Sequence, residues 1–188
     1  MRETVAAVVL AAGQSLRYGR AKLLDVVRGE PMLNHTLRCL LDGGVDRIVL
    51  VTGLDAAFAA VPLAHDSRVT VVVNPDPGRG MFSSVQAGLA AADGDCVIVL
   101  PGDMPFVRSA TVKDVIAECR RTRGPVVPTY LGKHGHPLAL TRSLVGQIRL
   151  GNPQSNLKAS LVESGEVLSE LAVGDEGVLR DVDLPEDL

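Results

Sequence analysis

Small and basic side chains gather in residues 10–22, which read LAAGQSLRYGRAK and follow an apolar run. The small residues let the backbone approach an anion closely, and the cations beyond them can neutralise its charge. The residues concerned are Ala11, Ala12, Gly13, Arg17, Arg20 and Lys22. This combination predicts a strand that leads into a loop binding the phosphates of a nucleotide. The alternative is an ordinary turn between a strand and a helix, with its basic residues in water.

The spacing of the glycines excludes two common phosphate-binding loops. A P-loop has four residues between its glycines and then Lys followed by Ser or Thr, whereas here five residues separate Gly13 from Gly19 and Arg20 follows. A dinucleotide fingerprint requires three glycines at fixed offsets, and this loop has two. The loop therefore favours neither a Walker-type ATPase nor a nicotinamide cofactor.

A carboxylate follows another apolar run. The segment VIVLPGDMP places Asp103 directly after Pro101 and Gly102, in a turn that we expect at the edge of a sheet. Mg²⁺ is a hard cation that commonly takes one or two protein carboxylates and completes its shell with water and substrate phosphates. Asp103 is therefore a candidate magnesium ligand. An Asp beside Gly also commonly stabilises a turn through its own backbone, which is the alternative role.

Short runs rich in Val and Ile recur between longer helical patterns. The expected strands cover residues 5–10, 47–52, 69–73, 96–100, 126–130 and 166–173. The expected helices cover residues 31–42, 55–62, 81–92, 109–121 (with Ser109 as N-cap), 142–150 and 155–164. Such alternation predicts right-handed crossovers, a mostly parallel sheet and helices on both faces. The loops after residues 10 and 100 should then open at the same edge of the sheet.

Length and composition narrow the class of protein. A chain of 188 residues can form one domain, so we expect a single domain over residues 1–188. The chain is 46% hydrophobic but only 3% aromatic, which suits an aliphatic core. A net charge of −3 argues against a broad nucleic-acid surface.

The three cysteines should be buried thiols, because Cys39, Cys96 and Cys119 lack metal-ligand spacing. With no signal-like or membrane-spanning run, we expect a cytoplasmic protein.

The loop at residues 10–22 resembles the LAAGxSxRMGxxK signature of the MobA-like nucleotidyltransferases, and its Ala-Ala-Gly form is similar to the molybdopterin cytidylyltransferase branch. The resemblance implies an α/β protein, with a three-layer αβα, Rossmann-like, mostly parallel sheet of the nucleotide-diphospho-sugar transferase type. It also implies Mg²⁺-dependent transfer of CMP from CTP to a molybdopterin-type acceptor, with release of pyrophosphate. Arg17, Lys22 and Asp103 would be catalytic, and Asp103 would also bind the metal.

Other motifs extend the resemblance. The segment NPDPGRGMFSSVQAGL matches a family segment that lies against the base and ribose. The resemblance therefore implies a set of nucleotide-binding residues. They are Leu10, Ala11, Ala12, Gly13, Asn74, Gly80, Ser83 and Ser84. The two serines could instead simply cap a helix.

The end of the chain and one histidine complete the implied site. The ending RDVDLPEDL is similar to the family's DIDTPEDL and implies Asp183 as a second metal ligand. Asp181 is the alternative ligand. Asp183 could instead have only a structural role, as the N-cap of a helix. Gly135, His136 and Pro137 match a motif that faces the acceptor, so His136 is the candidate substrate residue. The His-x-His pair that His136 forms with His134 lacks the further ligands of a zinc site.

One segment departs from the family pattern. Residues 151–156 read GNPQSN where a loop with acidic and basic residues near the second substrate is common. This leaves a different phosphorylated acceptor open, and also a non-catalytic nucleotide sensor. A nicotinamide-dependent oxidoreductase on the same kind of fold is the alternative from another enzyme class. A molybdoenzyme or its maturation factor would be a fitting protein partner for the main interpretation, with neither nucleic acid nor membrane involved.

Overall fold

A single large sheet forms the centre of the molecule. The computed structural model describes residues 3–13, 22–53, 61–152 and 154–182. The sheet has eight strands in the order β10-β7-β9-β6-β1-β4-β5, with β8 added beside β7. The strands are β1 (Val5–Ala11), β4 (Arg47–Thr52), β5 (Val69–Val73), β6 (Cys96–Pro101), β7 (Val126–Tyr130), β8 (Lys133–His134), β9 (Leu138–Thr141) and β10 (Ser169–Ala172). A small ribbon of β2 (Val26–Val27) and β3 (Glu30–Pro31) lies apart from it.

Most strands of the sheet run parallel. β1 lies between β4 and β6 and pairs with both in parallel register, and β5 and β10 also join their neighbours in parallel. The exceptions are β9, which pairs antiparallel with both β6 and β7, and β8, which pairs antiparallel with β7. The expected strands are confirmed to within a residue or two, except that β10 is shorter than residues 166–173. β8 and β9 were not expected from the sequence.

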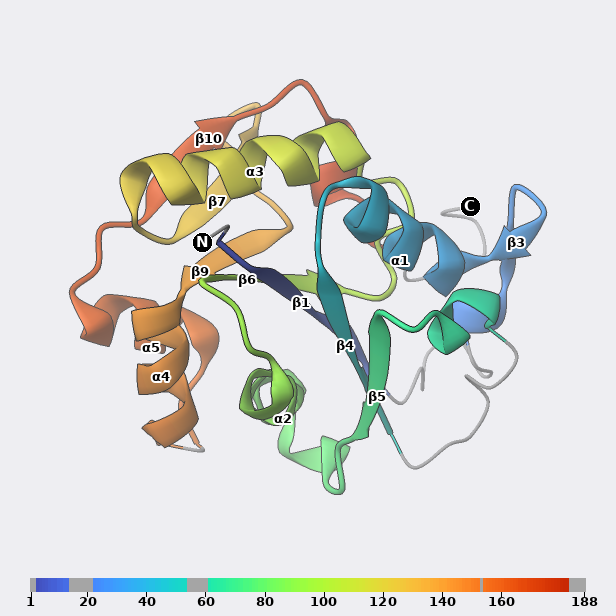
Figure 1. Ribbon diagram of the computed structural model, residues 1–188, viewed down its shortest axis with the longest axis horizontal. Coiled ribbons are helices and arrows are strands. Elements are labelled where there is room, and N and C mark those ends of the chain that lie inside the picture. Colours follow the sequence, from blue (N-terminus) through green and yellow to red (C-terminus); the bar gives the residue numbers. More distant parts are fainter. Residues whose placement is uncertain (1–2, 14–21, 54–60, 153, 183–188) are drawn as a thin grey trace.

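Helices cover both faces of the sheet, as Figure 1 shows: α1 and α3 lie on one side and α2, α4 and α5 on the other. The three-layer αβα arrangement expected from the sequence is confirmed. The helices are α1 (Met32–Asp42), α2 (Met81–Ala91), α3 (Ser109–Thr122), α4 (Arg142–Leu150) and α5 (Leu157–Ser164). Each begins and ends within two residues of its expected position, and the expected helix at residues 55–62 lies mostly outside the described residues. Short 3₁₀ turns are η1 (Lys22–Leu24), η3 (Pro62–His65), η4 (Pro77–Arg79) and η5 (Glu176–Leu179).

Alternate residues of β1 belong to two separate cores. Val9 packs into the core beneath α1 and α3, whereas Val8 packs into the core beneath α2 and α4. A strand buried on both faces must be apolar at every position, and this explains why β1 reads VAAVVLA. The three cysteines are buried free thiols, as expected.

The N-cap expected at Ser109 is wrong. The N-cap residue of helix α3 is Arg108, and its side chain makes no capping hydrogen bond. The Arg108 amide instead donates to a carboxylate oxygen of Asp175, 2.9 Å away, from a distant part of the chain. A tertiary contact thus holds the first residues of this helix, in the absence of a side-chain cap from its N-cap residue.

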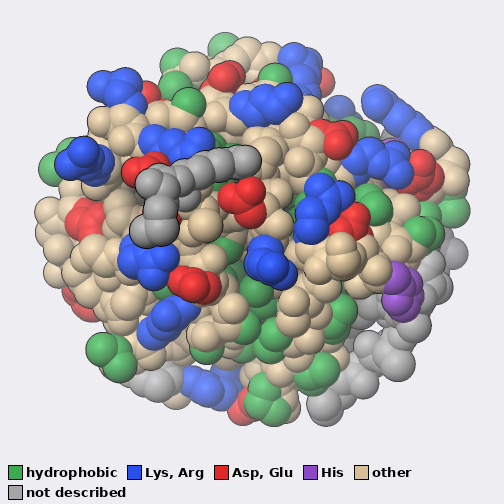
Figure 2. Space-filling model, viewed as in Figure 1, with side chains coloured by type: hydrophobic (Ala, Val, Ile, Leu, Met, Phe, Trp, Pro, Cys, Tyr) green, Lys and Arg blue, Asp and Glu red, His purple; other side chains and the backbone are tan. Residues whose placement is uncertain are grey.

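Surface charges of both signs are interspersed on the face drawn in Figure 2, which agrees with the small net charge. No helix within the described ranges has the length and apolar character needed to cross a membrane.

Gly88 lets helix α2 lie close to the sheet. A Cβ atom at this position would overlap the Val8 side chain of β1 and come within 2.7 Å of the Val51 side chain of β4. The approach therefore requires glycine, although glycine costs helix stability.

We expect Gly88→Ala to lower the free energy of unfolding by about 1–3 kcal/mol, because the added methyl group overpacks the core. Urea denaturation followed by circular dichroism measures this. Gly146→Ala in α4 is the matched control, since a Cβ there meets nothing within 4 Å. The control should raise stability by roughly 0.5–1 kcal/mol through helix propensity alone. Equal effects of the two substitutions would contradict the close approach of α2.

Candidate active site

A cavity of about 420 Å³ opens at the carboxyl end of β1 and β6. Its wall comes from five separate parts of the chain. The lining includes Leu10, Ala12 and Gly13 after β1; Gly80, Met81 and Ser84 at the start of α2; Pro101, Asp103 and Met104 after β6; His134, Gly135 and His136 around β8; and Val178, Leu179 and Asp181 near the end of the described chain. The cavity thus lies where the sequence predicted that two loops would meet.

Parallel pairing brings those two loops together. Leu10 of β1 lies opposite Pro101 of β6 in the register, and the Gly102 amide donates to the Leu10 carbonyl oxygen over 2.9 Å. The Thr36 hydroxyl of α1 donates to the Gly102 carbonyl oxygen, also over 2.9 Å. The turn that carries Asp103 is therefore held from both sides, which orients the carboxylate at the edge of the sheet.

Lys22 and Asp103 form an ion pair at this edge. The Lys22 Nζ atom lies 2.8 Å from Oδ2 of Asp103, and the two side chains are only 14% and 21% exposed. Nζ also donates to the Val182 carbonyl oxygen at 2.9 Å, and the Val182 amide donates to the Asp103 carbonyl oxygen at 3.0 Å. Two predicted catalytic residues thus lie in contact. Lys22 of 3₁₀ turn η1 and Val182 both lie against the turn that carries Asp103. The third, Arg17, lies outside the described residues.

Asp181 is the second carboxylate of the cavity wall. Two carboxylates on one cavity suit a hard divalent cation, which commonly takes one or two of them and leaves its other positions to water and phosphate. Within the described part of the chain, no group of three or more His, Cys, Asp or Glu side chains is placed to hold a metal ion. The described donors therefore suit a hard divalent cation that takes its remaining ligands from water and phosphate. Asp183, the preferred ligand from the sequence, lies outside the described residues.

Asn74 organises the turn before α2 from behind the cavity wall. It is buried, and its Nδ2 donates to the hydroxyls of Ser83 and Ser84 at 2.9 and 3.0 Å. Its Oδ1 accepts from the Asp76 amide at 3.0 Å. Of the predicted residues in this segment, Ser84 and Gly80 line the cavity, whereas Asn74 and Ser83 are not among its lining residues.

The alternative that these serines cap α2 is not what the structure shows. The N-cap is Gly80, whose φ of 94° favours glycine, and no side chain caps the helix there. The Ser83 hydroxyl instead donates to the Gly80 carbonyl oxygen at 2.8 Å. Both serines therefore hold the turn in place, and Ser84 does so at the cavity wall. Ala11 is buried in the core next to the cavity.

His136 is one of the lining residues of the cavity. Its amide donates to the Val178 carbonyl oxygen at 2.8 Å, and Nδ1 has no hydrogen-bond partner among the described residues. Burial holds the pKa of the imidazole below its ordinary value of 6.5, although the carboxylates of Asp103 and Asp181 oppose this shift. His136 is therefore a neutral imidazole near pH 7 and can offer a hydrogen bond to a ligand.

The neighbouring residues explain how His136 is held. A Cβ atom on Gly135 would overlap the Val178 carbonyl oxygen, so this close approach requires glycine. The His134 Nε2 atom lies 2.8 Å from Oε1 of Glu170 on β10. The two histidines of the His-x-His pair thus have different surroundings.

The segment at residues 151–156 connects α4 to α5. Asn156 caps α5 by accepting from the Ala159 amide at 2.9 Å, and Asn152 accepts from the Gln154 amide at the same distance. None of its described residues lines the cavity. The departure from the family pattern therefore falls outside the cavity wall.

Sequence reasoning missed part of this wall. Val178 and Leu179 contribute to the lining but belong to no motif that carries chemistry, and Met104 was not singled out although it directly follows Asp103. The segment DEG that begins at Asp175 was the available signal, because Asp two residues before Gly is typical of an Asx turn.

We expect the His136 imidazole to titrate below pH 6.5 in the metal-free protein, as measured by NMR of its ring protons. The unfolded chain then binds a proton near pH 6.5 that the folded protein does not bind. The free energy of unfolding should therefore fall as the pH drops below 6.5. His136→Gln identifies the resonance and should remove this part of the pH dependence. A titration midpoint at or above 6.5 would count against the buried, neutral imidazole.

Comparison with known proteins identifies the family. The sequence model of one protein family, the MobA-like NTP transferase domain, matches residues 7–167 of this chain. The molybdenum cofactor cytidylyltransferase of Escherichia coli K12 is 25% identical over 180 residues, which are 96% of this chain and 91% of that protein. A probable molybdenum cofactor guanylyltransferase of Opitutus terrae is 32% identical over 126 residues, 65% of this chain and 59% of that protein.

Solved structures agree with this. The manganese complex of Rv0371c from Mycobacterium tuberculosis H37Rv has a TM-score of 0.77 at 30% identity, covering 100% of this chain and 96% of that one. CMP:2-keto-3-deoxy-manno-octonic acid synthetase, solved with CTP, has a TM-score of 0.77 at 15% identity over 97% and 94% of the two chains, and shows the fold alone. Because the family model matches residues 7–167, which is more than half of the chain, the chain belongs to the MobA-like NTP transferase family and is a nucleotidyltransferase.

Proposed function

We propose that the protein transfers CMP from CTP to a molybdopterin-type acceptor and releases pyrophosphate, with Mg²⁺ as its cofactor. One observation carries this proposal: Asp103 and Asp181 line one cavity at the carboxyl edge of the sheet, and Lys22 forms an ion pair with Asp103. The similarity to a molybdenum cofactor cytidylyltransferase along 96% of the chain supports the choice of nucleotide and acceptor. The family assignment favours nucleotidyl transfer over the oxidoreductase and the non-catalytic sensor.

The proposed reaction is a displacement at the α-phosphorus of CTP. A phosphate oxygen of the acceptor forms a bond to that phosphorus, while the bond to the oxygen that bridges to the β-phosphate breaks. Pyrophosphate leaves with the electron pair. A phosphate nucleophile is already anionic, so the protein need not remove a proton. Its main tasks are to align two anions and to neutralise their charge.

Each charged side chain has a role in this reaction. Asp103 and Asp181 would hold the divalent cation, which supplies positive charge to phosphate oxygens when bound. Lys22 would stabilise negative charge on the phosphates, and its ammonium group is already held at the cavity by Asp103 and the Val182 carbonyl oxygen. Arg17 would assist from the loop after β1, and Asp183 remains a further candidate metal ligand.

Nucleotide and acceptor would occupy opposite walls. The loop after β1, with Leu10, Ala12 and Gly13, and the start of α2, with Gly80 and Ser84, would bind the nucleotide. Ala11, Asn74 and Ser83 would support them from behind. His136, another lining residue, would contact the acceptor. A molybdoenzyme or its maturation factor is the partner that we propose for the product.

We expect pyrophosphate release only when the protein is given Mg²⁺, CTP and molybdopterin together, since each supplies one part of the displacement. An enzyme-coupled phosphate assay with each of the four ribonucleoside triphosphates measures this. Release with GTP instead would contradict the choice of CTP. Release with another phosphorylated acceptor, such as a sugar 1-phosphate, but not with molybdopterin would contradict the choice of acceptor.

We expect Asp103→Asn and Asp181→Asn each to lower kcat by about 10²-fold or more, by analogy with the loss of one electrostatic group from a transition state. Asp181→Asn should not lower the melting temperature strongly, because Asp181 is exposed, whereas Asp103→Asn also breaks the ion pair with Lys22 and should lower the melting temperature to some extent. Asp114→Asn, an exposed residue of α3, is the matched control. Activity of either cavity variant within twofold of the wild type, with an unchanged Mg²⁺ requirement, would remove that residue from the proposed metal site.

A further inference from the structure

Residues 175–182 form a strap that follows β10 and borders the cavity. Val178, Leu179 and Asp181 of this strap line the cavity, and Val178 and Val182 are fully buried. Its regular structure is limited to the short turn η5 (Glu176–Leu179). A segment with so little secondary structure depends on hydrogen bonds to other elements for its position.

Asp175 anchors the start of the strap to helix α3. Its side chain is only 4% exposed, and both carboxylate oxygens are used. Oδ2 accepts from the Arg108 amide at 2.9 Å and from the Thr111 hydroxyl at 2.6 Å. Oδ1 accepts from the Gly177 amide at 3.1 Å and lies 3.6 Å from Nε of Arg108. A buried carboxylate requires such partners, because an unpaired charge in the interior is costly.

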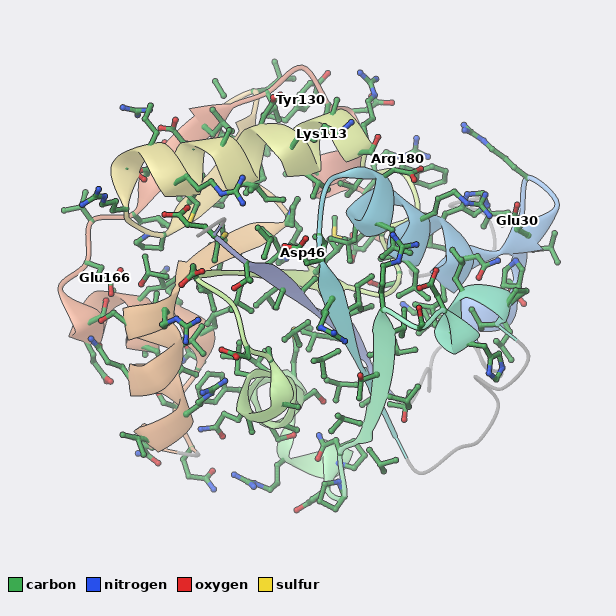
Figure 3. All side chains as sticks on the ribbon, in the orientation of Figure 1. Glu30, Asp46, Lys113, Tyr130, Glu166 and Arg180 are labelled. Carbon is green, nitrogen blue, oxygen red and sulfur yellow. The ribbon has the colours of Figure 1, made fainter. Side chains whose placement is uncertain are left out.

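The strap is also pressed against the loop between β6 and α3. A Cβ atom on Gly177 would overlap the Phe106 carbonyl oxygen. The guanidinium of Arg180, labelled in Figure 3, lies 4.2 Å from the centre of the Phe106 ring. Asp175 and Phe106 therefore fix the strap to the same loop that carries Asp103.

From this anchor the strap reaches both sides of the cavity. The Val178 carbonyl oxygen accepts the His136 amide. Val182 pairs with the Asp103 backbone and accepts from Lys22 Nζ. Any shift of the strap would therefore move Asp181 directly and would disturb His136 and the Lys22–Asp103 pair through their hydrogen bonds.

We propose that Asp175 is a positioning residue for nucleotidyl transfer: by clamping the strap to the N-terminus of α3, it sets the positions of Asp181, Lys22 and His136 at the cavity. Asp175 is not among the lining residues, so it acts through the strap and contacts no substrate. The inference about catalysis rests on the proposed function, whereas the clamp itself rests on the contacts alone.

Asp175→Asn is the central variant, because it preserves shape and size. An amide side chain has one acceptor oxygen, so it can serve either Gly177 or the pair of groups on α3, and not both. Thr111→Val removes one partner hydroxyl at similar shape, and Thr111→Ser restores it. Glu176→Gln changes the adjacent acid, which is exposed and pairs only with Arg180 in the described chain. Val115→Ala, on the buried face of α3, should lower stability by about as much as Asp175→Asn while leaving the contacts of Asp175 intact.

Two measurements separate positioning from mere stability. Hydrogen exchange of the Val182 and His136 amides reports the strap directly. Binding of Mn²⁺ in the presence of CTP, followed by electron paramagnetic resonance, reports the cavity without requiring turnover. In Asp175→Asn and Thr111→Val, we expect these amides to exchange at least 10-fold faster than the rate calculated from the global loss of stability. We also expect both substitutions to weaken Mn²⁺ binding at least fivefold. Thr111→Ser, Glu176→Gln and Val115→Ala should stay within twofold on both measurements.

Wild-type exchange at both amides in Asp175→Asn would overturn the clamp. Faster exchange with unchanged Mn²⁺ binding would overturn its positioning role and leave Asp175 purely structural. If Val115→Ala changed both amide exchange and Mn²⁺ binding as much as Asp175→Asn does, the positioning role would likewise be overturned. A wild-type protein that binds Mn²⁺ and CTP but transfers no nucleotide would refute the proposed function and not the clamp, whereas failure of the wild type to bind Mn²⁺ would overturn the positioning role as well.

Discussion

Parallel pairing of β1 with β6 is the constraint on which the site depends. Because both strands run in the same direction, the loops that follow them leave the sheet at one edge. The pairing brings a loop of small residues near position 12 next to the turn that carries Asp103. The rest of the fold can be understood as support for this edge: α1 bonds the turn from one face, and α2 approaches closely on the other because Gly88 has no side chain.

Polar groups at this edge obtain their partners from distant parts of the chain. Lys22 bonds to Val182, which is 160 residues away, and Asp175 bonds to Thr111 across 64 residues. The side chains involved are largely removed from water, so each needs a partner to offset its desolvation. The same burial keeps His136 neutral despite two carboxylates nearby. Charge at the cavity is therefore balanced by tertiary contacts.

The regular elements could be predicted from the sequence because their signals are local. The runs at residues 5–10 and 96–100 are apolar at every position, as expected for strands buried on both faces. β9 was missed because its pattern, LALT, is only four residues long and follows His136 and Pro137 directly. It is a strand because β6 and β7 leave a place between them that it fills in antiparallel register. The cap expected at Ser109 is wrong because α3 begins one residue earlier, with Arg108 as its N-cap, and the Arg108 amide bonds to a carboxylate of the strap.

The candidate site divides in the same way. The sequence by itself determined the alternating strands and helices, the loop of small residues after β1 and the turn at Asp103, because apolar periodicity and turn chemistry depend on residues close together in the chain. Only the tertiary structure decided that Lys22 pairs with Asp103, that Asp181 lines the cavity, that Asn74 supports its wall from behind and that Asp175 holds the strap. These outcomes depend on which distant groups meet at one edge of the sheet and must satisfy one another there away from water.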